Sequence, residues 1–168
     1  MKKYIIKGPT NSISGTVNVN GAKNSCLPLM AASILFKDKV ILKNVPLVKD
    51  VITMKNLLIS LGSKVEILKT NKMIIKNSKP HKRRVPYKLV STMRAGVLTM
   101  GSLLGRYQKK KIYVAKGGGC SLGIRDINYH LSGFESLAAE HRLEKGYVRI
   151  HSKNVSKLGR RDVPESVN

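Results

Sequence analysis

One glycine-rich segment holds the most reactive side chain of the sequence. Glycines occupy positions 117–119, Cys120 follows them, and Lys116 and Arg125 flank the segment. Glycines let backbone N–H groups approach an anionic ligand closely, and neighbouring cations favour a thiolate or tune a cysteine as a proton donor. A free cysteine is more often a small buried hydrophobe. The segment alone therefore leaves two alternatives, a reactive thiol or a glycine-rich turn with an incidental one.

Two further cations have positions that indicate anion binding. Residues 21–24 read Gly-Ala-Lys-Asn between an expected strand and an expected helix, so the charge of Lys23 would add to that of the helix N-terminal amides. The alternative is an ordinary exposed surface lysine. Arg94 lies in an otherwise apolar segment, where it requires an anionic partner. Neither segment has the spacing of a phosphate-binding P-loop or a dinucleotide fingerprint.

The elements that must position these residues follow from the hydrophobic pattern. Period-two alternation and turn residues predict strands at 4–6, 15–19, 39–43, 64–69, 72–76, 111–114, 142–144 and 147–150. Helical spacing predicts helices at 27–36, with Asn24 or Ser25 as N-cap, at 51–61 between an Asp50 cap and Gly62, at 89–104, and at 127–137 behind an Asp126 cap.

The expected elements form an internal repeat. Asp50 and Asp126, Leu61 and Leu137, and Ile67 and Leu143 match at one constant offset, so the order helix, strand, helix, strand, strand occurs twice. Such units pack helices against strands, and the fold class is therefore α/β. Residues 152–168 are polar and aperiodic, and we expect this tail to be disordered or truncated.

Composition restricts the function classes. Lys and Arg number 32 against 9 Asp and Glu, which gives a formal charge of +23 and favours anionic partners. Nucleic acid is an unlikely partner, because the lysines are scattered and aromatic residues make up only 5% of the chain. No apolar run approaches the ~20 residues of a membrane span, and no signal-peptide pattern follows the basic start, so we expect a cytoplasmic protein. The two cysteines and four histidines lack metal-ligand spacing, so no metal or cofactor is expected.

Three segments together resemble the UDP-N-acetylglucosamine 1-carboxyvinyltransferase family of enolpyruvyltransferases. They are residues 21–28, 86–95 and 118–125, and shorter similarities at 44–46, 50–51, 61–62, 101–106 and 144–148 occur in family order. The resemblance implies an inside-out α/β barrel built from repeated units. It also implies transfer of the enolpyruvyl group of phosphoenolpyruvate to the 3-hydroxyl of UDP-N-acetylglucosamine, with release of phosphate, as the first committed step of peptidoglycan synthesis.

The resemblance also assigns roles to residues. It implies that Cys120 is the general acid toward the substrate methylene group. Phosphoenolpyruvate would bind to Lys23, Asn24 and Arg125. UDP-N-acetylglucosamine would contact Arg94, Arg125, Asp126, Ile127, Asn128 and Tyr129. Two positions depart from the family pattern, since Asp126 adds a carboxylate beside the anion site and Lys116 replaces the usual proline.

Family members have two domains of three units each, whereas this chain has about two units. We therefore expect an N-terminal fragment: residues 1–22 would be strands that belong with an absent second domain, and residues 23–151 would be a partial domain. Activity would be impaired, and the chain would need the missing domain or self-association. Three alternatives stay open: transfer to shikimate 3-phosphate within the same fold, a basic nucleic-acid or anion-binding module, and a non-functional fragment.

Overall fold

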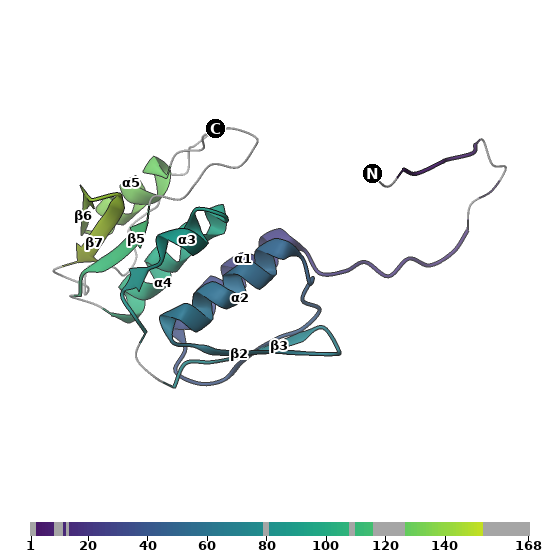
Figure 1. The fold of residues 1–168 in the computed structure, drawn as a ribbon, viewed down its shortest axis with the longest axis horizontal. Coiled ribbons are helices and arrows are strands. Elements are labelled where there is room, and N and C mark those ends of the chain that lie inside the picture. The colour runs from purple at the N-terminus through teal and green to yellow at the C-terminus, as the bar shows by residue number, and fades with distance from the viewer. Residues whose placement is uncertain are drawn as a thin grey trace.

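The computed structural model describes residues 3–8, 12, 14–78, 81–107, 110–115 and 127–152. Two sheets follow one another along the chain, and helices pack against each of them (Figure 1). The first sheet is antiparallel and the second is mixed. The strand order is β1-β3-β2 in the first sheet and β4-β5-β7-β6 in the second. Among the described residues, no helix is long and apolar enough to cross a membrane.

The first unit begins with a helix and ends with a hairpin. Its elements are α1 (Lys23–Ala32), the 3-10 turn η1 (Ser33–Leu35), β1 (Val40–Leu42), α2 (Lys49–Leu61), β2 (Lys64–Leu68) and β3 (Lys72–Lys76). β3 lies antiparallel between β1 and β2. Asn71 turns the hairpin with a φ of 53°, in the left-handed region that Asn tolerates.

The second unit repeats this plan. Its elements are β4 (Arg84–Val85), α3 (Tyr87–Val90), the 3-10 helix η2 (Arg94–Leu98), α4 (Thr99–Arg106), β5 (Ile112–Ala115), α5 (Asn128–Ser136), β6 (Ala139–Glu144) and β7 (Tyr147–Ser152). β7 lies antiparallel between β5 and β6, as β3 lies between β1 and β2. The predicted internal repeat is therefore confirmed. β4 was not predicted, and it adds a short parallel strand beside β5.

The core lies between the helices and the inner faces of the sheets. The apolar residues predicted for α2 are all buried, and Gly62 ends this helix at a φ of 119°, as the pattern predicted. The inner faces of β5 and β7 contribute four fully buried side chains, Ile112, Val114, Val148 and Ile150. In α5, Leu131 is buried, whereas its neighbour His130 is exposed.

Two helix starts were predicted wrongly. α1 starts at Lys23 rather than near Leu27, and its N-cap is Ala22, which has no side chain able to bond the first amides. α2 starts at Lys49, so Asp50 lies inside the first turn and makes no capping bond. A capping pattern depends on local sequence alone. The carboxylate of Asp50 instead binds Lys23 of α1, which is distant in the sequence.

The helix predicted over 89–104 is interrupted. It consists of α3, a turn, η2 and α4, and Met93 is extended at φ −147°. The hydroxyl groups of Ser91 and Thr92 donate to the carbonyls of Lys88 and Leu89. These bonds compete with the helical N–H groups for the same acceptors, which explains the interruption.

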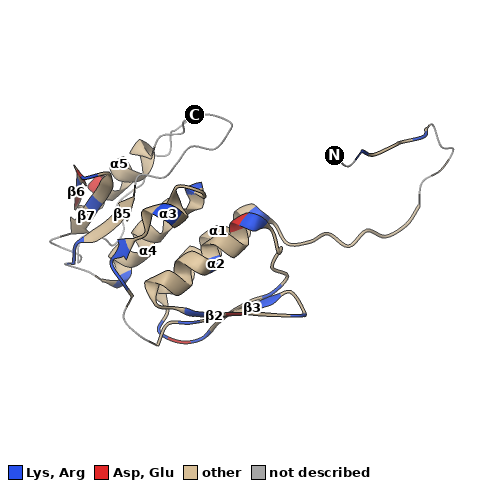
Figure 2. Cartoon of the chain, in the orientation of Figure 1, with Lys and Arg blue, Asp and Glu red and all other residues tan. Residues whose placement is uncertain are grey.

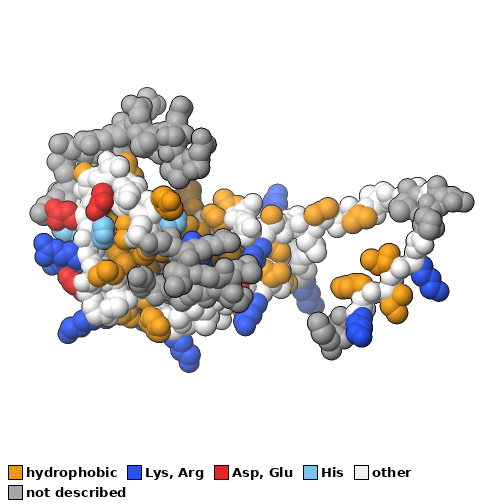
Figure 3. Space-filling model, turned by 90° about the horizontal axis from the view of Figure 1, so that it is seen from above, with side chains coloured by type: hydrophobic (Ala, Val, Ile, Leu, Met, Phe, Trp, Pro, Cys, Tyr) orange, Lys and Arg blue, Asp and Glu red, His pale blue; other side chains and the backbone are white. Residues whose placement is uncertain are grey.

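The strands predicted at 4–6 and 15–19 are not formed in the described residues. The described residues of 3–20 form no strand, and the segment extends away from the two units (Figure 1). Its large apolar side chains, including Tyr4, Ile5 and Val17, are 84–94% exposed, and Figure 3 shows such side chains along this extension. A strand needs a hydrogen-bonding partner. The pairing of residues 1–22 with a second domain stays a prediction.

The predicted tail begins one residue too early. Ser152 is buried in β7, so it belongs to the fold rather than to the tail.

Two side chains, one from each unit, satisfy the carbonyl groups at the end of α1 and η1. The Nδ2 amide of Asn77 donates to the carbonyls of Ser33 at 2.7 Å and of Phe36 at 3.1 Å. The Arg106 guanidinium, at the end of α4, donates to the carbonyls of Ile34 at 2.7 Å and of Phe36 at 2.6 Å. A helix leaves its last carbonyl groups without an N–H partner in the helix. The bonds from Arg106 satisfy such carbonyls of the first unit and thereby join the two units.

A buried histidine completes this network. His81 is 5% exposed, and its Nε2 lies 2.9 Å from Ser63 Oγ and 3.1 Å from Asn77 Oδ1. With the proton on Nε2, Nδ1 accepts from the Tyr107 hydroxyl at 2.9 Å. The same hydroxyl accepts from the His81 backbone N–H. The neutral ring can therefore hydrogen-bond with all of these groups. Burial is the main cause that lowers the pKa of His81, and the positive charge of Arg106 lowers it further.

This arrangement predicts a loss of stability in mild acid. The pKa of His81 is lowered in the folded state, while an unfolded histidine titrates near about 6.5. The free energy of unfolding should therefore be at its full value above about pH 6.5 and fall as the pH decreases through that value. Urea unfolding midpoints measured at a series of pH values test this. His81→Gln should lower stability and flatten the pH dependence, whereas His130→Gln, on the exposed face of α5, should leave the slope unchanged. An equal slope in both variants would contradict the role of His81.

Candidate functional site

The start of α1 presents unbonded backbone donors. The first helical bond runs from the Cys26 N–H to the Ala22 carbonyl at 3.0 Å, so the N–H groups of residues 23–25 have no acceptor within the helix. Ala22 supplies no capping side chain, and the first turn contains no acidic residue. This helix end is therefore electropositive and open to an anion.

Gly21 allows the chain to reach this position. A Cβ on Gly21 would overlap the carbonyl oxygen of Asn44, and it would lie 3.3 Å from Cδ of Pro46. The backbone before α1 thus touches the backbone that follows β1. Only glycine leaves room for this contact, which sets where α1 begins.

Lys23 is held by an acidic residue of the neighbouring helix. Its Nζ lies 2.9 Å from Asp50 Oδ2, and the two side chains are 47% and 37% exposed. Figure 2 shows basic and acidic positions together where α1 and α2 begin side by side. An exposed ion pair adds little to stability, at most about 1 kcal/mol, so its main effect here is to orient the ammonium group.

Arg94 lies at the same end of the helix layer. α4 ends at Arg106, which bonds the carbonyls at the end of α1 and η1, and η2 packs beside α1. α1 and the segment from η2 to α4 therefore run in the same direction, and their N-terminal ends lie together. Arg94 is half-buried, and within the described part of the chain no carboxylate forms an ion pair with it.

Cys120, Arg125 and Asp126 lie outside the described residues, and their predicted roles stay predictions. The ends of the segment that contains them are described. β4 and β5 are parallel, and α3 begins directly after β4. The chain after Ala115 thus leaves the sheet from the same edge at which α3 begins. The edge that leads into α3 and Arg94 is therefore also the edge from which the Cys120 segment starts.

The remaining predicted site residues lie at the start of α5. Ile127 is half-buried before the first turn, and Asn128 and Tyr129 form its first two residues. Tyr129 is 74% exposed, which leaves its ring accessible to a ligand. Asn128 and Tyr129 are both exposed, and their role in binding stays a prediction.

Sequence reasoning missed Asp50 as a member of this site. Its position before an apolar helical stripe indicated a cap, and no local signal relates it to a lysine of another helix.

The second cysteine differs from a reactive thiol. Cys26 is 7% exposed, and burial raises the pKa of its thiol, so it stays protonated and shielded.

The chain resembles known proteins over most of its length. A sequence profile of the family described as EPSP synthase (3-phosphoshikimate 1-carboxyvinyltransferase) matches residues 7–164. Proteins named UDP-N-acetylglucosamine 1-carboxyvinyltransferase are similar to it: that of Magnetococcus marinus is 43% identical over 89% of this chain, and that of Pelagibacter ubique is 40% identical over 90%. That of Hydrogenovibrio crunogenus is 39% identical over 88%.

Each of these relatives is much longer, since the matched region covers only 35–36% of it. The crystal structure of the enolpyruvyl transferase NikO from Streptomyces tendae has the same fold over 85% of this chain and 31% of that chain, with a TM-score of 0.69 at 16% sequence identity. The predicted fold class is therefore confirmed: repeated α/β units of an incomplete enolpyruvyltransferase-like fold.

The contact at Gly21 predicts a large effect of a small substitution. Gly21→Ala would force the segment between β1 and α2 away from α1, and we expect the free energy of unfolding to fall by about 1–3 kcal/mol, as for other overpacked sites. The matched control is Gly133→Ala in α5, where a Cβ meets no atom within 4 Å. There the free energy of unfolding should rise by about 0.5–1 kcal/mol, because alanine favours the helix. Denaturant unfolding of both variants checks the opposite signs, and an undiminished stability of Gly21→Ala would refute the contact.

Proposed function

This chain belongs to the EPSP synthase family, and from that premise we propose that it forms one wall of a site that transfers the enolpyruvyl group of phosphoenolpyruvate to UDP-N-acetylglucosamine. The choice of acceptor rests on relatives named for that sugar nucleotide at 39–43% identity. The alternative acceptor within the family is shikimate 3-phosphate. The Gly-Ala-Lys-Asn sequence at 21–24 and the Gly-Gly-Cys sequence at 118–120 favour the sugar nucleotide.

The observation that carries the proposal is the arrangement of cations at one end of the helix layer. Lys23 and Arg94 lie at neighbouring helix starts, and the open amides of α1 point to the same end. Both substrates are anions, one a phosphorylated carboxylate and the other a diphosphate. A site of fixed cations and helix N-termini stabilises such charges without reorganisation during the reaction.

The proposed chemistry proceeds in two steps. The 3-hydroxyl oxygen of the sugar adds to C2 of phosphoenolpyruvate, the hydroxyl proton leaves to a base, and Cys120 donates a proton to the methylene carbon. This gives a tetrahedral ketal. The bond from C2 to the phosphate oxygen then breaks, a proton leaves the resulting methyl group, and the products are the enolpyruvyl ether and phosphate.

The residues of this chain would divide the binding between them. Lys23, Asn24 and Arg125 would hold phosphoenolpyruvate, with Asp50 orienting Lys23. Arg94, Arg125 and the segment 126–129 would hold the sugar nucleotide. Exclusion of water from these charges requires a second wall. Because the chain spans about a third of the relatives it matches, we propose that the second wall, with the base for the sugar hydroxyl, belongs to a missing domain or a separate chain.

The biological setting is part of the same proposal. Transfer to UDP-N-acetylglucosamine is the first committed step of peptidoglycan synthesis, and it serves cell wall formation, cell shape and division. The substrates of such a step are cytoplasmic, and we propose that the chain acts there without a metal or another cofactor.

Lys23 provides the first test of the site. Lys23→Met should weaken binding of phosphoenolpyruvate about tenfold or more, measured by calorimetry with UDP-N-acetylglucosamine present, because a charge-assisted bond to phosphate is lost. Lys49→Met is the matched control: it removes the same charge from an exposed position at the start of α2, one residue from Asp50. Equal losses in the two variants would show that only net charge matters and would contradict the assignment. Binding of shikimate 3-phosphate in place of the sugar nucleotide would select the alternative acceptor.

The thiol assignment has a covalent test. An epoxide phosphonate such as fosfomycin should alkylate Cys120 and spare Cys26, because a buried thiol with a raised pKa offers little thiolate. Mass spectrometry of the digested protein locates the adduct. Cys26→Ala should keep full labelling, and Cys120→Ala should abolish it. Labelling of both thiols alike, or of neither, would argue against Cys120 as the reactive residue.

A further inference from the structure

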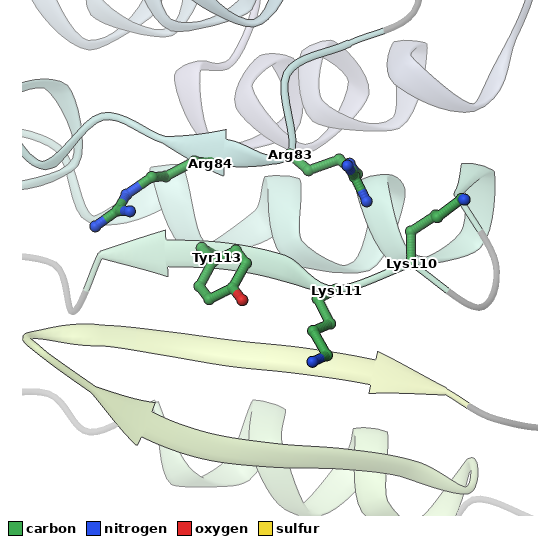
Figure 4. Close-up of a pocket in the computed structure, with 5 residues that line it drawn as sticks. All are labelled: Arg83, Arg84, Lys110, Lys111 and Tyr113. Atoms are coloured by element: carbon green, nitrogen blue, oxygen red, sulfur yellow. The ribbon is translucent and has the colours of Figure 1, made fainter.

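A second concentration of positive charge lies beside the second sheet, at β4 and β5. Arg83, Arg84, Lys110, Lys111 and Tyr113 line a cavity of about 670 Å³, which we name the basic pocket. Figure 4 shows Arg83, Lys110 and Lys111 around the beginnings of β4 and β5. A cavity of this size is in the range that holds small organic ligands, about 300–1,000 Å³.

The sheet places these side chains on its solvent face. Arg84 pairs with Tyr113, Tyr113 with Arg149, and Arg149 with Arg142, so one row of side chains crosses all four strands. Neighbours in a row share a face. The opposite face carries the buried apolar residues of β5 and β7, so the row and the basic pocket face outward.

One arginine of the pocket is held in place by aromatic rings. The Arg84 guanidinium lies 4.3 Å from the ring centroid of Tyr147 and 5.9 Å from that of Tyr113. Such stacking fixes the plane of the guanidinium and leaves its N–H groups free to bond along their edges. A planar fork of donors of this kind matches the two oxygens of a phosphate group.

The four cations of the basic pocket have no acidic counterpart among the described residues. In that part of the chain, ion pairs join Lys23 with Asp50 and Arg149 with Glu144, and the rings of His141 and His151 contact Glu135 and Glu140. None of these contacts includes a pocket cation. In the row, Arg149 is neutralised by Glu144 at 2.9 Å, whereas Arg84 is not. Four like charges around one cavity repel one another, and a multivalent anion would relieve that repulsion.

We propose that the basic pocket binds a ligand with two or more adjacent phosphate groups. The number of cations favours several phosphates over a single carboxylate, and the open position on a sheet face admits either a free polyphosphate or the backbone of a single-stranded nucleic acid. The basic pocket shares no residue with the proposed catalytic site. Arg83, Lys110 and Lys111 lie where the parallel strands β4 and β5 begin, and the Arg84 guanidinium reaches over Tyr147, which pairs with Ala115 at the end of β5.

Calorimetric titration of the 168-residue chain with inorganic tripolyphosphate, at about 150 mM salt, tests the site. Lys110→Gln combined with Lys111→Gln should weaken binding about tenfold or more. The matched control is Lys64→Gln combined with Lys76→Gln, an exposed cross-strand pair of the first sheet that loses the same charge. The control should change affinity by less than about twofold, because screening limits the effect of distant charges. Arg84→Lys, which keeps the charge but loses the planar fork, should also weaken binding.

Equal weakening by the two double variants would overturn the proposal, as would absence of binding by the parent chain. A competing oligothymidylate of about ten nucleotides identifies the source of the phosphates. If it displaces tripolyphosphate and binds more tightly, the ligand is a nucleic acid backbone; if it binds more weakly, the ligand is a free polyphosphate. The weakening caused by Lys110→Gln with Lys111→Gln should be the same in the parent chain and in a Lys23→Met background, so failure of the catalytic proposal and failure of this one give different results.

Discussion

The carbonyl groups at the end of α1 and η1 are the constraint on which the arrangement of this chain depends. A helix end that is covered by another element must find donors for its last carbonyls, and here Asn77 and Arg106 supply them. Asn77 follows β3 in the first unit and Arg106 ends α4 in the second, so the Arg106 bonds also join the two repeated units. They also make α1 run in the same direction as α4, and that direction brings Lys23 and Arg94 to one end of the layer. The geometry of the site is thus a consequence of backbone hydrogen bonding far from it.

The distribution of charge follows from the same architecture. Helix N-termini collect at one end of the layer, where Lys23 is balanced by Asp50 and the open amides of α1 remain. The basic pocket lies beside β4 and β5, on the face of the second sheet opposite its buried apolar side chains. A formal charge of +23 on 168 residues makes every additional unpaired cation costly. Concentrating cations in two separate places is tolerable only when solvent or a bound anion screens them, and both places are open to solvent.

Local patterns predicted those parts of the fold that local chemistry determines. Gly62 ends α2 because only a residue tolerant of positive φ fits there, and the hairpin between β6 and β7 turns at Lys145 and Gly146, both at positive φ. The repeat was also predictable, because each unit must bury a stripe of apolar residues in the same order. Predictions failed where the outcome depended on distant partners. β4 has only two residues and exists because β5 lies beside it, and residues 15–19 alternate like a strand but pair with none of the described residues.

The site shows the same division between local and distant causes. The Gly-Ala-Lys-Asn sequence at 21–24 correctly indicated a helix start suited to an anion, since a glycine, a lysine and unbonded amides are all local features. The ion pair with Asp50 was missed, because it depends on α1 and α2 beginning side by side, and that alignment depends in turn on the contact between Gly21 and Asn44. A residue that orients another through space has no spacing rule in the sequence. It can be found only after the packing that brings the two elements together is known, and for this reason the positioning residues of a site are harder to predict than the residues that touch the substrate.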